Sequence, residues 1–556
     1  MIEKVKISYG ILDQTIGEDN KNYSVSSKTI YCDVSQTLNS NYDKDKLTYL
    51  ESDYFLLDGT FKFPGGDKYD LGYESLNLSD GQGYLNEYVE YQFENEHDSY
   101  GVQIYFRTII NDFTIEYYNG GTLLDTISIT NYSELRYINK KAILGWNKVK
   151  IGIYKISNAY QRARISNIVF GINDDYDENY IMEISASKTT SINNDNSNSS
   201  EVSVSFFNEG RFDINNLRDL PVGLQSGAKL SVYFDNKLFN EYIVDSTKVD
   251  DEGYKITLEG YDKLYYANDT FYGKGKVYSE GRTLYDWAID VANDGNLQVQ
   301  VDDSLKNIIS KGYIGFVPHR EALRMICEAS NSIMIVEEGI IKIVSYNKNV
   351  IGDISDDEIL EDTFNIENDE KCLGVKLTKY NYVLGSNEVG LAEIQDIVLT
   401  GENQEIEVEY SSYPSLPLKV VYKTDSSMQI ISQELYSDRA KFVIKGNKGD
   451  TSWITILGKN YTENTSIISK GFVEQNYKEI KNTLITETDN ANSVLDFQFT
   501  NSTNLYTYGA TLYSDKDFKL LDATKIKNYN VIVVGLMYNL NEDENSLDIV
   551  SVDNNG

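Results

Sequence analysis

Apolar and polar residues alternate along three successive segments in the middle of the chain. The segments are residues 230–236, 241–249 and 254–264. Alternation with a period of two is typical of half-buried strands, because successive side chains of a strand point to opposite faces of the sheet. The pattern therefore predicts three antiparallel strands in a row. A further strand is expected at residues 340–346, after a turn at Glu338-Gly339.

Between these strands the apolar period changes to that of a helix. Leu284, Trp287, Ala288 and Val291 follow one helical face, and so do Ala322, Leu323, Ile326 and Cys327. Such spacing predicts amphipathic helices near residues 281–294 and 319–330.

The first third of the chain is strand-like almost throughout. Short alternating segments recur between Tyr23 and Ile184, and Asn119-Gly120-Gly121 predicts a tight hairpin turn between two of them. Many short strands separated by turns are typical of a β-sandwich. We therefore expect a mainly β, multidomain protein with a few short helices.

These patterns divide the chain into five expected parts. They are an N-terminal arm or strand (1–22), a β-sandwich (23–185), a polar linker (186–200), a β domain that carries two helices (201–350) and a β-rich C-terminal domain (351–556). Residues 190–200 are polar and of low complexity. They fit either a linker between domains or a loop inside one domain, and the linker is favoured because strand periodicity restarts at Val202.

The charge of the chain narrows the classes of partner. The 51 basic and 86 acidic residues give a net charge of −35, which repels the phosphates of nucleic acids. No segment approaches about 18 consecutive apolar residues, so no membrane insertion and no secretion signal are expected. The 45 tyrosines, against 20 phenylalanines, suit sheet faces that lie at wet interfaces.

Candidate catalytic and metal-binding residues are few. The chain has 2 histidines, His97 and His319, and 3 distant cysteines, Cys32, Cys327 and Cys372. This set predicts no catalytic site, no disulfide framework and no metal site. Cofactors are not expected. Calcium in the sandwich is the weaker alternative, with oxygen ligands from residues 174–180 or 193–200.

A sugar site needs an exposed aromatic platform beside amide and carboxylate groups. Its candidate residues in the sandwich are Tyr73, Tyr117, Tyr118, Asn119 and Trp146. The alternative is that one residue of each adjacent pair faces the core and that Trp146 packs inside the sandwich. This alternative is favoured over the sugar site.

The middle of the chain resembles the hub-like domain of baseplate and tail-tip proteins in phages and phage-tail-like particles of low-GC Gram-positive bacteria. The resemblance rests on a "G-x-D-x-L" turn, Gly260, Asp262 and Leu264, and on a later "REAL" helix with Arg320, Glu321, Ala322 and Leu323. In the resemblance these residues are structural and none is catalytic. The hub-like domains imply a β-barrel architecture.

Two other regions extend the resemblance to most of residues 50–540. The segments YFLLDGT, with Asp58 and Gly59, LGYES, DSYGVQIYF and RARISNIVFG resemble a jelly-roll-like, carbohydrate-binding-like module of tail proteins. Tyr73 stands where that family often has Trp. Near the C-terminus Asn482, Leu484, Ile485, Thr486 and Ala491 match a further motif of the family. In the family this motif leads into a helix, so the resemblance implies a third helix near residues 486–497. Where the family often has P-x-L-x-x-G-D, this chain has FKLLDAT, so both the Pro and the Gly are missing and the match is partial.

The resemblance implies a structural protein of a phage tail or tail-like particle, at its baseplate or tail tip, and no enzyme. Its partners would be other tail and baseplate proteins and further copies of itself, with three-fold or six-fold symmetry. It would assemble in the cytoplasm of the host bacterium and leave by lysis as part of the virion. The alternative is a receptor-binding protein whose sandwich recognises cell-wall carbohydrate, and a wall-degrading enzyme is the weakest alternative.

Overall fold

The computed structural model is mainly β, as predicted, and its helices are short. It describes residues 4–10, 16, 19–30, 32–38, 72–99, 101–139, 141, 143–171, 174–193, 199–208, 227–235, 237–250, 254–345, 352–368, 372–502, 506–513, 518–540 and 545–553. The chain divides into two compact units. Unit 2 contains residues 7–176 and 209–230, and unit 1 contains residues 1–6, 177–208 and 231–556.

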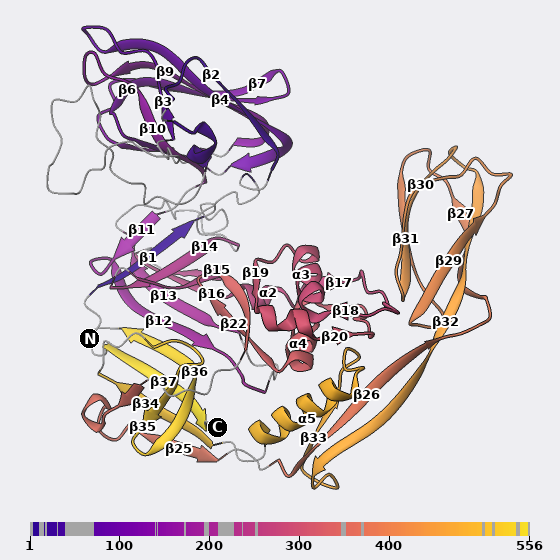
Figure 1. Cartoon of the computed structure of the whole chain (residues 1–556). Helices are drawn as coiled ribbons and strands as arrows, with labels where there is room; N and C mark the ends of the chain where they lie inside the picture. Colours follow the sequence, from indigo (N-terminus) through magenta and orange to yellow (C-terminus); the bar gives the residue numbers. More distant parts are fainter. Residues whose placement is uncertain are drawn as a thin grey trace. The chain divides into compact units, whose positions relative to one another are not determined.

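Unit 2 contains a β-sandwich of two antiparallel sheets (Figure 1). One sheet has the strand order β2-β4-β9-β6-β7 and the other has the order β3-β10-β5-β8. The strands are β2 (Lys21–Val25), β3 (Tyr73–Glu74), β4 (Tyr84–Ser99), β5 (Val102–Phe106), β6 (Ile110–Asn119), β7 (Thr122–Ile129), β8 (Arg136–Asn139), β9 (Ile143–Ile156) and β10 (Arg164–Phe170); a 3-10 helix, η1 (Val34–Leu38), packs on β10.

Alternation along the strands builds the core of the sandwich. In β4, Val89, Tyr91 and Phe93 are buried, whereas Glu90 and Gln92 between them are partly exposed. Strand β9 repeats this pattern, and the inward residues of both sheets share one hydrophobic cluster. The alternation in the sequence thus corresponds to one buried and one partly exposed face in each strand.

Unit 1 contains most of a thirteen-stranded sheet, in which the strands β11-β1-β14-β15-β16-β13-β12-β36-β37-β34-β25 follow one another and β35 and β24 branch from β36. The strands are β1 (Val5–Gly10), β11 (Asp174–Asp177), β12 (Ile181–Thr189), β13 (Glu201–Phe207), β14 (Lys229–Phe234), β15 (Lys237–Val249), β16 (Lys255–Tyr261), β24 (Gly352–Ile354), β25 (Asn365–Asn368), β34 (Tyr506–Leu512), β35 (Ala523–Ile526), β36 (Tyr529–Leu540) and β37 (Asn545–Asp553). All three strands predicted between residues 230 and 264 are present, as β14, β15 and β16.

The predicted linker at residues 186–200 is not a linker between domains. Strands β12 and β13 on its two sides pair antiparallel, with Ala186 opposite Val202. Strand β12 also pairs with β36, with Thr189 opposite Gly535. The polar segment therefore connects two neighbouring strands of one sheet, and the same pairing joins the predicted domains 201–350 and 351–556 in one unit.

A layer of helices forms the second part of unit 1. Its helices are α2 (Lys263–Tyr266), α3 (Leu284–Asp294), α4 (His319–Ser330), α5 (Thr488–Ser502) and the 3-10 helix η3 (Asp303–Asn307). It also contains a sheet of the strands β19 (Val299–Val301), β23 (Ile340–Ser345) and β22 (Ser332–Glu337). Two short strand pairs complete it: β17 (Phe271–Tyr272) with β21 (Val317–Pro318), and β18 (Arg282–Thr283) with β20 (Ile309–Ser310). Helices α3, α4 and α5 confirm the three predicted helices. Helix α2 was not predicted because a single turn has no apolar period to detect. No helix in the described part of the chain is long and apolar enough to span a membrane.

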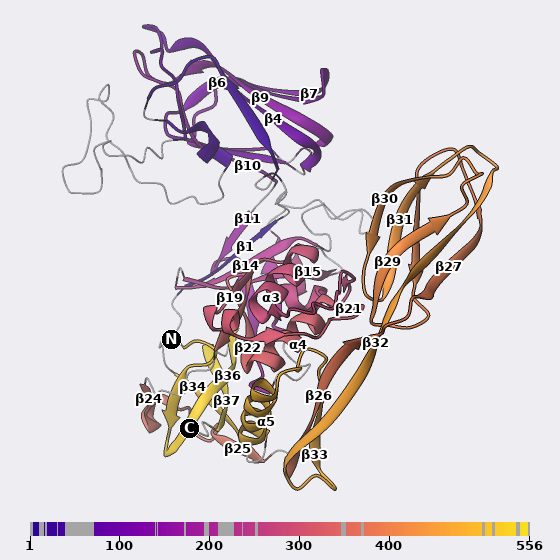
Figure 2. The same ribbon diagram turned by 45° about the vertical axis from the view of Figure 1, so that its right-hand side comes forward.

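The third part of unit 1 is built on one long strand, β32 (Thr451–Gly471) (Figure 2). Its second half pairs with β26 (Gly374–Leu384), which also pairs with β33 (Tyr477–Lys481). Its first half lies between β27 (Val389–Val398) and β29 (Ser415–Tyr422). The sheet β28-β31-β30 (Gln404–Glu409, Arg439–Lys445, Gln429–Leu435) shares a separate small core with that half. We call this small sandwich the lobe.

Candidate functional site

The residues predicted for a sugar site do not come together on one surface. Tyr73 and Trp146 are fully buried, and Tyr117 is 1% exposed. Tyr117 and Trp146 pack edge to face with ring centroids 5.4 Å apart, and the indole nitrogen donates a hydrogen bond to Ser99 Oγ at 3.2 Å. These three rings therefore belong to the sandwich core and offer no exposed platform for a sugar. For Trp146 and for one of the adjacent residues Tyr117 and Tyr118 this is the favoured alternative.

Tyr118 and Asn119 are the two sugar candidates that remain partly exposed. The Tyr118 hydroxyl donates a hydrogen bond to Glu116 Oε2 at 2.6 Å, and this bond raises the pKa of Tyr118 to about 12. The Asn119 amide donates to Glu96 Oε1 at 2.7 Å and to Gly145 O at 2.8 Å. Asn119 thus holds the end of a hairpin, whereas Tyr118 faces outward from the sheet.

The "G-x-D-x-L" turn connects the large sheet of unit 1 to the helices. A Cβ atom at Gly260 would lie 2.5 Å from Ile243 O, so only glycine allows β15 and β16 to approach this closely. Asp262 is the N-cap of α2, where one carboxylate oxygen accepts the backbone N–H groups of Leu264 and Tyr265 at 3.0 and 3.3 Å. Leu264 is buried in the core beneath the helices.

Asp262 also binds a third segment of the chain. Its other carboxylate oxygen accepts the backbone N–H of Ser200 at 2.7 Å, at the start of β13. The side chain is 0% exposed, and burial raises its pKa above the ordinary value of 3.8 despite these hydrogen bonds. One buried carboxyl group therefore fixes the positions of β13 and α2.

The "REAL" helix is α4. Its Ala322 and Leu323 are fully buried in the same core as Leu264. Glu321 accepts two hydrogen bonds from the Arg324 guanidinium, each at 2.7 Å. Burial lowers the pKa of the Arg320 guanidinium. The nearby carboxylates of Asp262 and Glu321 act in the opposite direction and raise it. The two motifs of the middle region are thus neighbours.

The C-terminal motif lies against α4. The fully buried Asn482 amide donates to Met325 O at 2.7 Å and to Glu328 Oε2 at 3.0 Å, while its oxygen accepts the Leu484 N–H at 3.0 Å. Leu484, Ile485 and Ala491 belong to the same core as α4. We call this place, where residues 260–264, α4 and residues 482–486 meet, the motif junction.

A further segment completes the motif junction. Ser310 Oγ donates to Leu484 O at 2.7 Å, and Thr483 Oγ1 donates to Tyr313 O at 2.6 Å. The backbone N–H of Lys311 donates to Thr486 Oγ1 at 3.0 Å. Sequence reasoning missed residues 310–313 because they have no regular period, and only these hydrogen bonds reveal their part in the junction.

Both histidines are buried beside an aspartate. His97 Nε2 lies 3.0 Å from Asp19 Oδ2, and the ring packs on Phe93 and Trp146. His319 Nε2 lies 3.2 Å from Asp294 Oδ2, while Nδ1 lies 2.9 Å from Thr270 Oγ1. Each ring therefore has polar partners inside a packed core, which is a structural role for a histidine.

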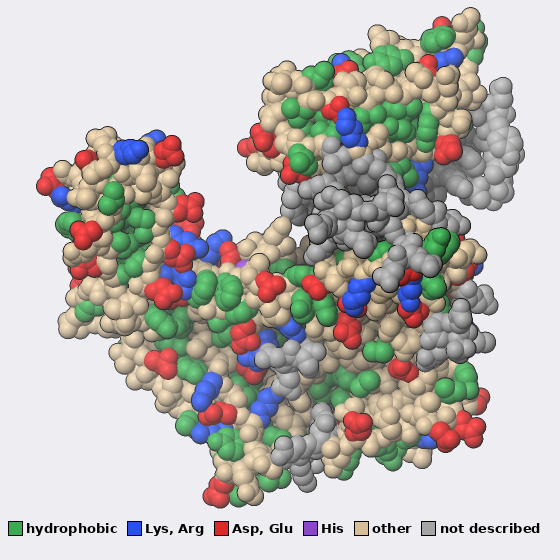
Figure 3. Space-filling model, turned by 180° about the vertical axis from the view of Figure 1, so that it is seen from behind, with side chains coloured by type: hydrophobic (Ala, Val, Ile, Leu, Met, Phe, Trp, Pro, Cys, Tyr) green, Lys and Arg blue, Asp and Glu red, His purple; other side chains and the backbone are tan. Residues whose placement is uncertain are grey.

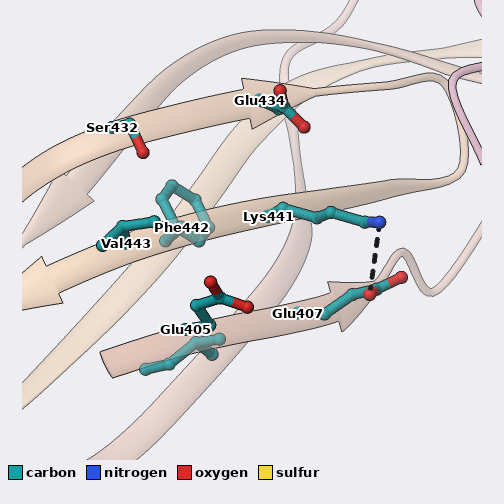
Figure 4. A pocket seen from close by; sticks show the side chains of 8 residues that line it. Glu405, Glu407, Ser432, Glu434, Lys441, Phe442 and Val443 are labelled. Atoms are coloured by element: carbon teal, nitrogen blue, oxygen red, sulfur yellow. Dashed lines mark ion pairs between the residues drawn. The ribbon is translucent and has the colours of Figure 1, made fainter. Parts of the chain in front are cut away.

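The lobe carries a shallow groove of about 350 Å³ on the outer face of its sheet β28-β31-β30 (Figure 4). Glu407, Lys441 and Glu434 stand in one row across the three strands. Lys441 Nζ lies 3.7 Å from Glu407 Oε2. Such partly exposed pairs of opposite charge are ordinary for a solvated sheet face.

The remaining predictions concern metals and the N-terminal motif. Among the described residues there is no group of three or more His, Cys, Asp or Glu side chains that could hold a metal ion. Asp58 and Gly59, and parts of the segments 174–180 and 193–200 proposed for calcium, lie outside the residues or side chains that the structure describes.

No protein-family model matches the chain, and no curated protein matches it. Among solved structures it is similar to the 43 kDa tail protein of prophage MuSo2 from Shewanella oneidensis, with a TM-score of 0.38 and 11% identity over 68% of this chain and 95% of the other. The tail protein from Neisseria meningitidis MC58 has a TM-score of 0.38 and 10% identity over 68% and 93% of the two chains. Prophage tail protein gp18 from Listeria monocytogenes has a TM-score of 0.37 and 10% identity over 68% and 91%. All three similarities are distant.

Proposed function

We propose that the chain is a structural protein of a phage tail or a phage-tail-like particle, located at the baseplate or tail tip. It acts by assembling with neighbouring tail proteins and with further copies of itself, and it catalyses no reaction. Its β-sheets provide rigid surfaces for these contacts.

The observation that carries the proposal is the convergence of the tail-protein motifs on the motif junction. Gly260 to Leu264, the α4 residues and Asn482 to Thr486 are far apart in sequence, yet their buried residues share one core. Each motif has a physical role there: close strand approach, helix capping, or a buried amide bridge. Residues from three separate motifs thus stabilise the same core. This supports the interpretation that the motifs belong to one family fold and do not match by chance.

A second observation supports assembly. Within the described residues, β26 is the only strand that pairs with the half of β32 from Thr462 to Gly471. The side chains of this half are mostly exposed, including Ile467 at 59%. An unpaired strand edge is a template for a strand of another chain. We propose that it pairs with a neighbouring subunit in a three-fold or six-fold assembly.

The location is tested by labelling tail particles purified from the bacterium that encodes the chain. Antibodies against the chain should mark one end of the tail in electron micrographs, and the chain should appear in the protein content of the particles. Antibodies against a capsid protein serve as the control. Purified tails without the chain would contradict the proposal.

The strand edge is tested by Ile467→Lys, which places a charge on the edge that a neighbour would cover. Incorporation into particles should fall by about tenfold or more, because a buried, unpaired charge opposes association. Leu144→Lys in unit 2, at a side chain that is 57% exposed, is the matched control. Equal incorporation of both variants would rule out this edge as an interface, without deciding whether the chain is a tail protein.

A further inference from the structure

The outer face of the five-stranded sheet in unit 2 carries tyrosine rings among charged side chains. Its central part is a grid of three rows on β4, β9 and β6. The rows are Gln92, Lys148 and Tyr118; Glu90, Lys150 and Glu116; and Tyr88, Gly152 and Thr114. We call this grid the tyrosine face. Apart from the buried Gly152, its residues have partly exposed side chains, whereas the residues between them point into the core.

The two tyrosines of the grid are held in place by charged neighbours. The ammonium group of Lys148 lies 4.5 Å from the ring centroid of Tyr118, whose hydroxyl is fixed by Glu116. The ammonium group of Lys150 lies 5.1 Å from the ring centroid of Tyr88. Rings that are already ordered lose less conformational freedom when a ligand stacks on them.

A third tyrosine borders the grid at Gly152. A Cβ atom at Gly152 would lie 2.5 Å from the Tyr154 hydroxyl oxygen and 2.9 Å from Thr114 Oγ1. The glycine thus leaves room for the Tyr154 hydroxyl, which lies 3.2 Å from Thr114 Oγ1. Tyr154 is 39% exposed and adds a further ring beside Tyr88 and Thr114.

The polar groups of the tyrosine face supply donors and acceptors without a net charge. Two lysines, Lys148 and Lys150, stand with two glutamates, Glu90 and Glu116, in a chain whose net charge is −35. Lys148 Nζ lies 3.6 Å from Glu90 Oε2. Such a face complements a neutral ligand rich in hydroxyl groups better than a nucleic acid or a basic protein.

We propose that the tyrosine face binds a neutral polysaccharide, with Tyr88 and Tyr118 as stacking platforms and Glu90, Glu116 and Gln92 as hydrogen-bonding partners of its hydroxyl groups. Tyr88 and Tyr118 stand at opposite corners of the grid. They are roughly 16 Å apart by a strand spacing of about 4.8 Å and a rise of about 3.3 Å per residue. That span favours several linked sugars over a single one. This inference does not depend on the tail-protein proposal.

The test uses the full-length chain and immobilised neutral bacterial polysaccharides built of glucose, galactose, rhamnose or N-acetylhexosamine, with poly(glycerol phosphate) as an anionic polymer. The wild type should bind at least one neutral polysaccharide. Tyr88→Ala combined with Tyr118→Ala should weaken that binding about tenfold or more, because each lost ring removes a stacking surface. Tyr118→Phe keeps the ring and should bind within about threefold of the wild type.

Tyr254→Ala is the matched control, because Tyr254 lies in unit 1 and is 57% exposed. Its binding should equal that of the wild type, and thermal unfolding should show that all variants are folded. Three results would overturn the inference: no binding of the wild type to any neutral polysaccharide, equal binding by the double variant, or binding to poly(glycerol phosphate) alone.

Discussion

The sandwich core of unit 2 and the centre of the motif junction in unit 1 are both buried, but different forces hold them together. In the sandwich, Trp146 packs against Phe93, Tyr117 and Phe170, with ring centroids 4.7 to 5.5 Å apart. In the motif junction, the buried side chains of Asp262 and Asn482 bind the backbones of distant segments. Apolar packing tolerates many side chains of similar volume, whereas a buried polar bridge requires one particular geometry.

This difference explains why recognisable motifs fall on the motif junction. Leu264 and Leu323 could each be replaced by another large apolar residue at modest cost. Gly260, Asp262 and Asn482 have no such substitutes, because each meets a main-chain group at a fixed distance. Unlike these two buried regions, the surface is rich in charged side chains. On the side drawn in Figure 3 the acidic ones are scattered and do not gather in one patch.

The largest effect is expected from removing the ring at the centre of the sandwich. Trp146→Ala should lower the free energy of unfolding by about 3–5 kcal/mol, because it leaves a cavity among aromatic rings. Urea unfolding followed by circular dichroism measures the loss. Leu144→Ala, two residues away and exposed, should change stability by less than about 0.5 kcal/mol. A small effect of Trp146→Ala would mean that apolar packing does not dominate unit 2.

A smaller but still large effect is expected in the motif junction. Asn482→Ala leaves Met325 O, Glu328 and the Leu484 N–H without this partner. It should lower the free energy of unfolding by about 1–3 kcal/mol, the cost of leaving a buried polar group unpaired. Asn482→Leu keeps much of the volume and should be no better, which separates lost hydrogen bonds from lost packing. Asn381→Ala, at an exposed position of β26, is the control. Full stability of Asn482→Leu would remove the contrast between the two regions.

The two regions should also respond oppositely to pH. Hydrogen bonds, above all from the Asn95 backbone N–H, lower the pKa of Asp19 in unit 2, so its stabilisation is present above the ordinary value of 3.8 and is lost as the pH falls through the lowered pKa. Burial raises the pKa of Asp262, so its contribution is present below 3.8 and is lost as the pH rises through the raised pKa.

Unfolding of Asp19→Asn and Asp262→Asn in urea between about pH 3 and pH 7 checks these signs. The loss of stability in Asp19→Asn should grow with pH, and that in Asp262→Asn should shrink. Wild-type protein at each pH is the reference. Parallel slopes for the two variants would show that desolvation does not govern Asp262.

The smallest effect is expected at the edge of the motif junction. The Glu321 and Arg324 side chains are 33% and 23% exposed, so solvent screens their pair. Glu321→Ala should therefore lower the free energy of unfolding by only about 0.5–1 kcal/mol. Glu402→Ala, at an exposed turn of the lobe, should have no measurable effect. A loss as large as that of Asn482→Ala would show that the charged rim supports the junction as much as its buried amide.

Much of the fold could be predicted from local patterns. Alternation located β14, β15 and β16, and helical spacing located α3 and α4. The linker prediction was wrong because a polar, low-complexity segment has the same composition in a hairpin connection as between domains. Adjacent strand residues face opposite sides, so the sequence predicted that one of Tyr117 and Tyr118 is buried but did not settle which one. The structure places Tyr117 and Trp146 in the core, in line with the favoured alternative to a sugar site.

By itself the sequence determined the mainly β class, the strands β14, β15 and β16, and the helices α3 and α4. The tertiary structure alone decided that Asn482 meets α4, that β12 pairs with β36, and that Tyr88 and Tyr118 share one face. Local elements follow from short-range periodicity and capping, which the sequence encodes directly. Contacts between distant segments depend on strand register and core packing, which form only when the whole chain is folded.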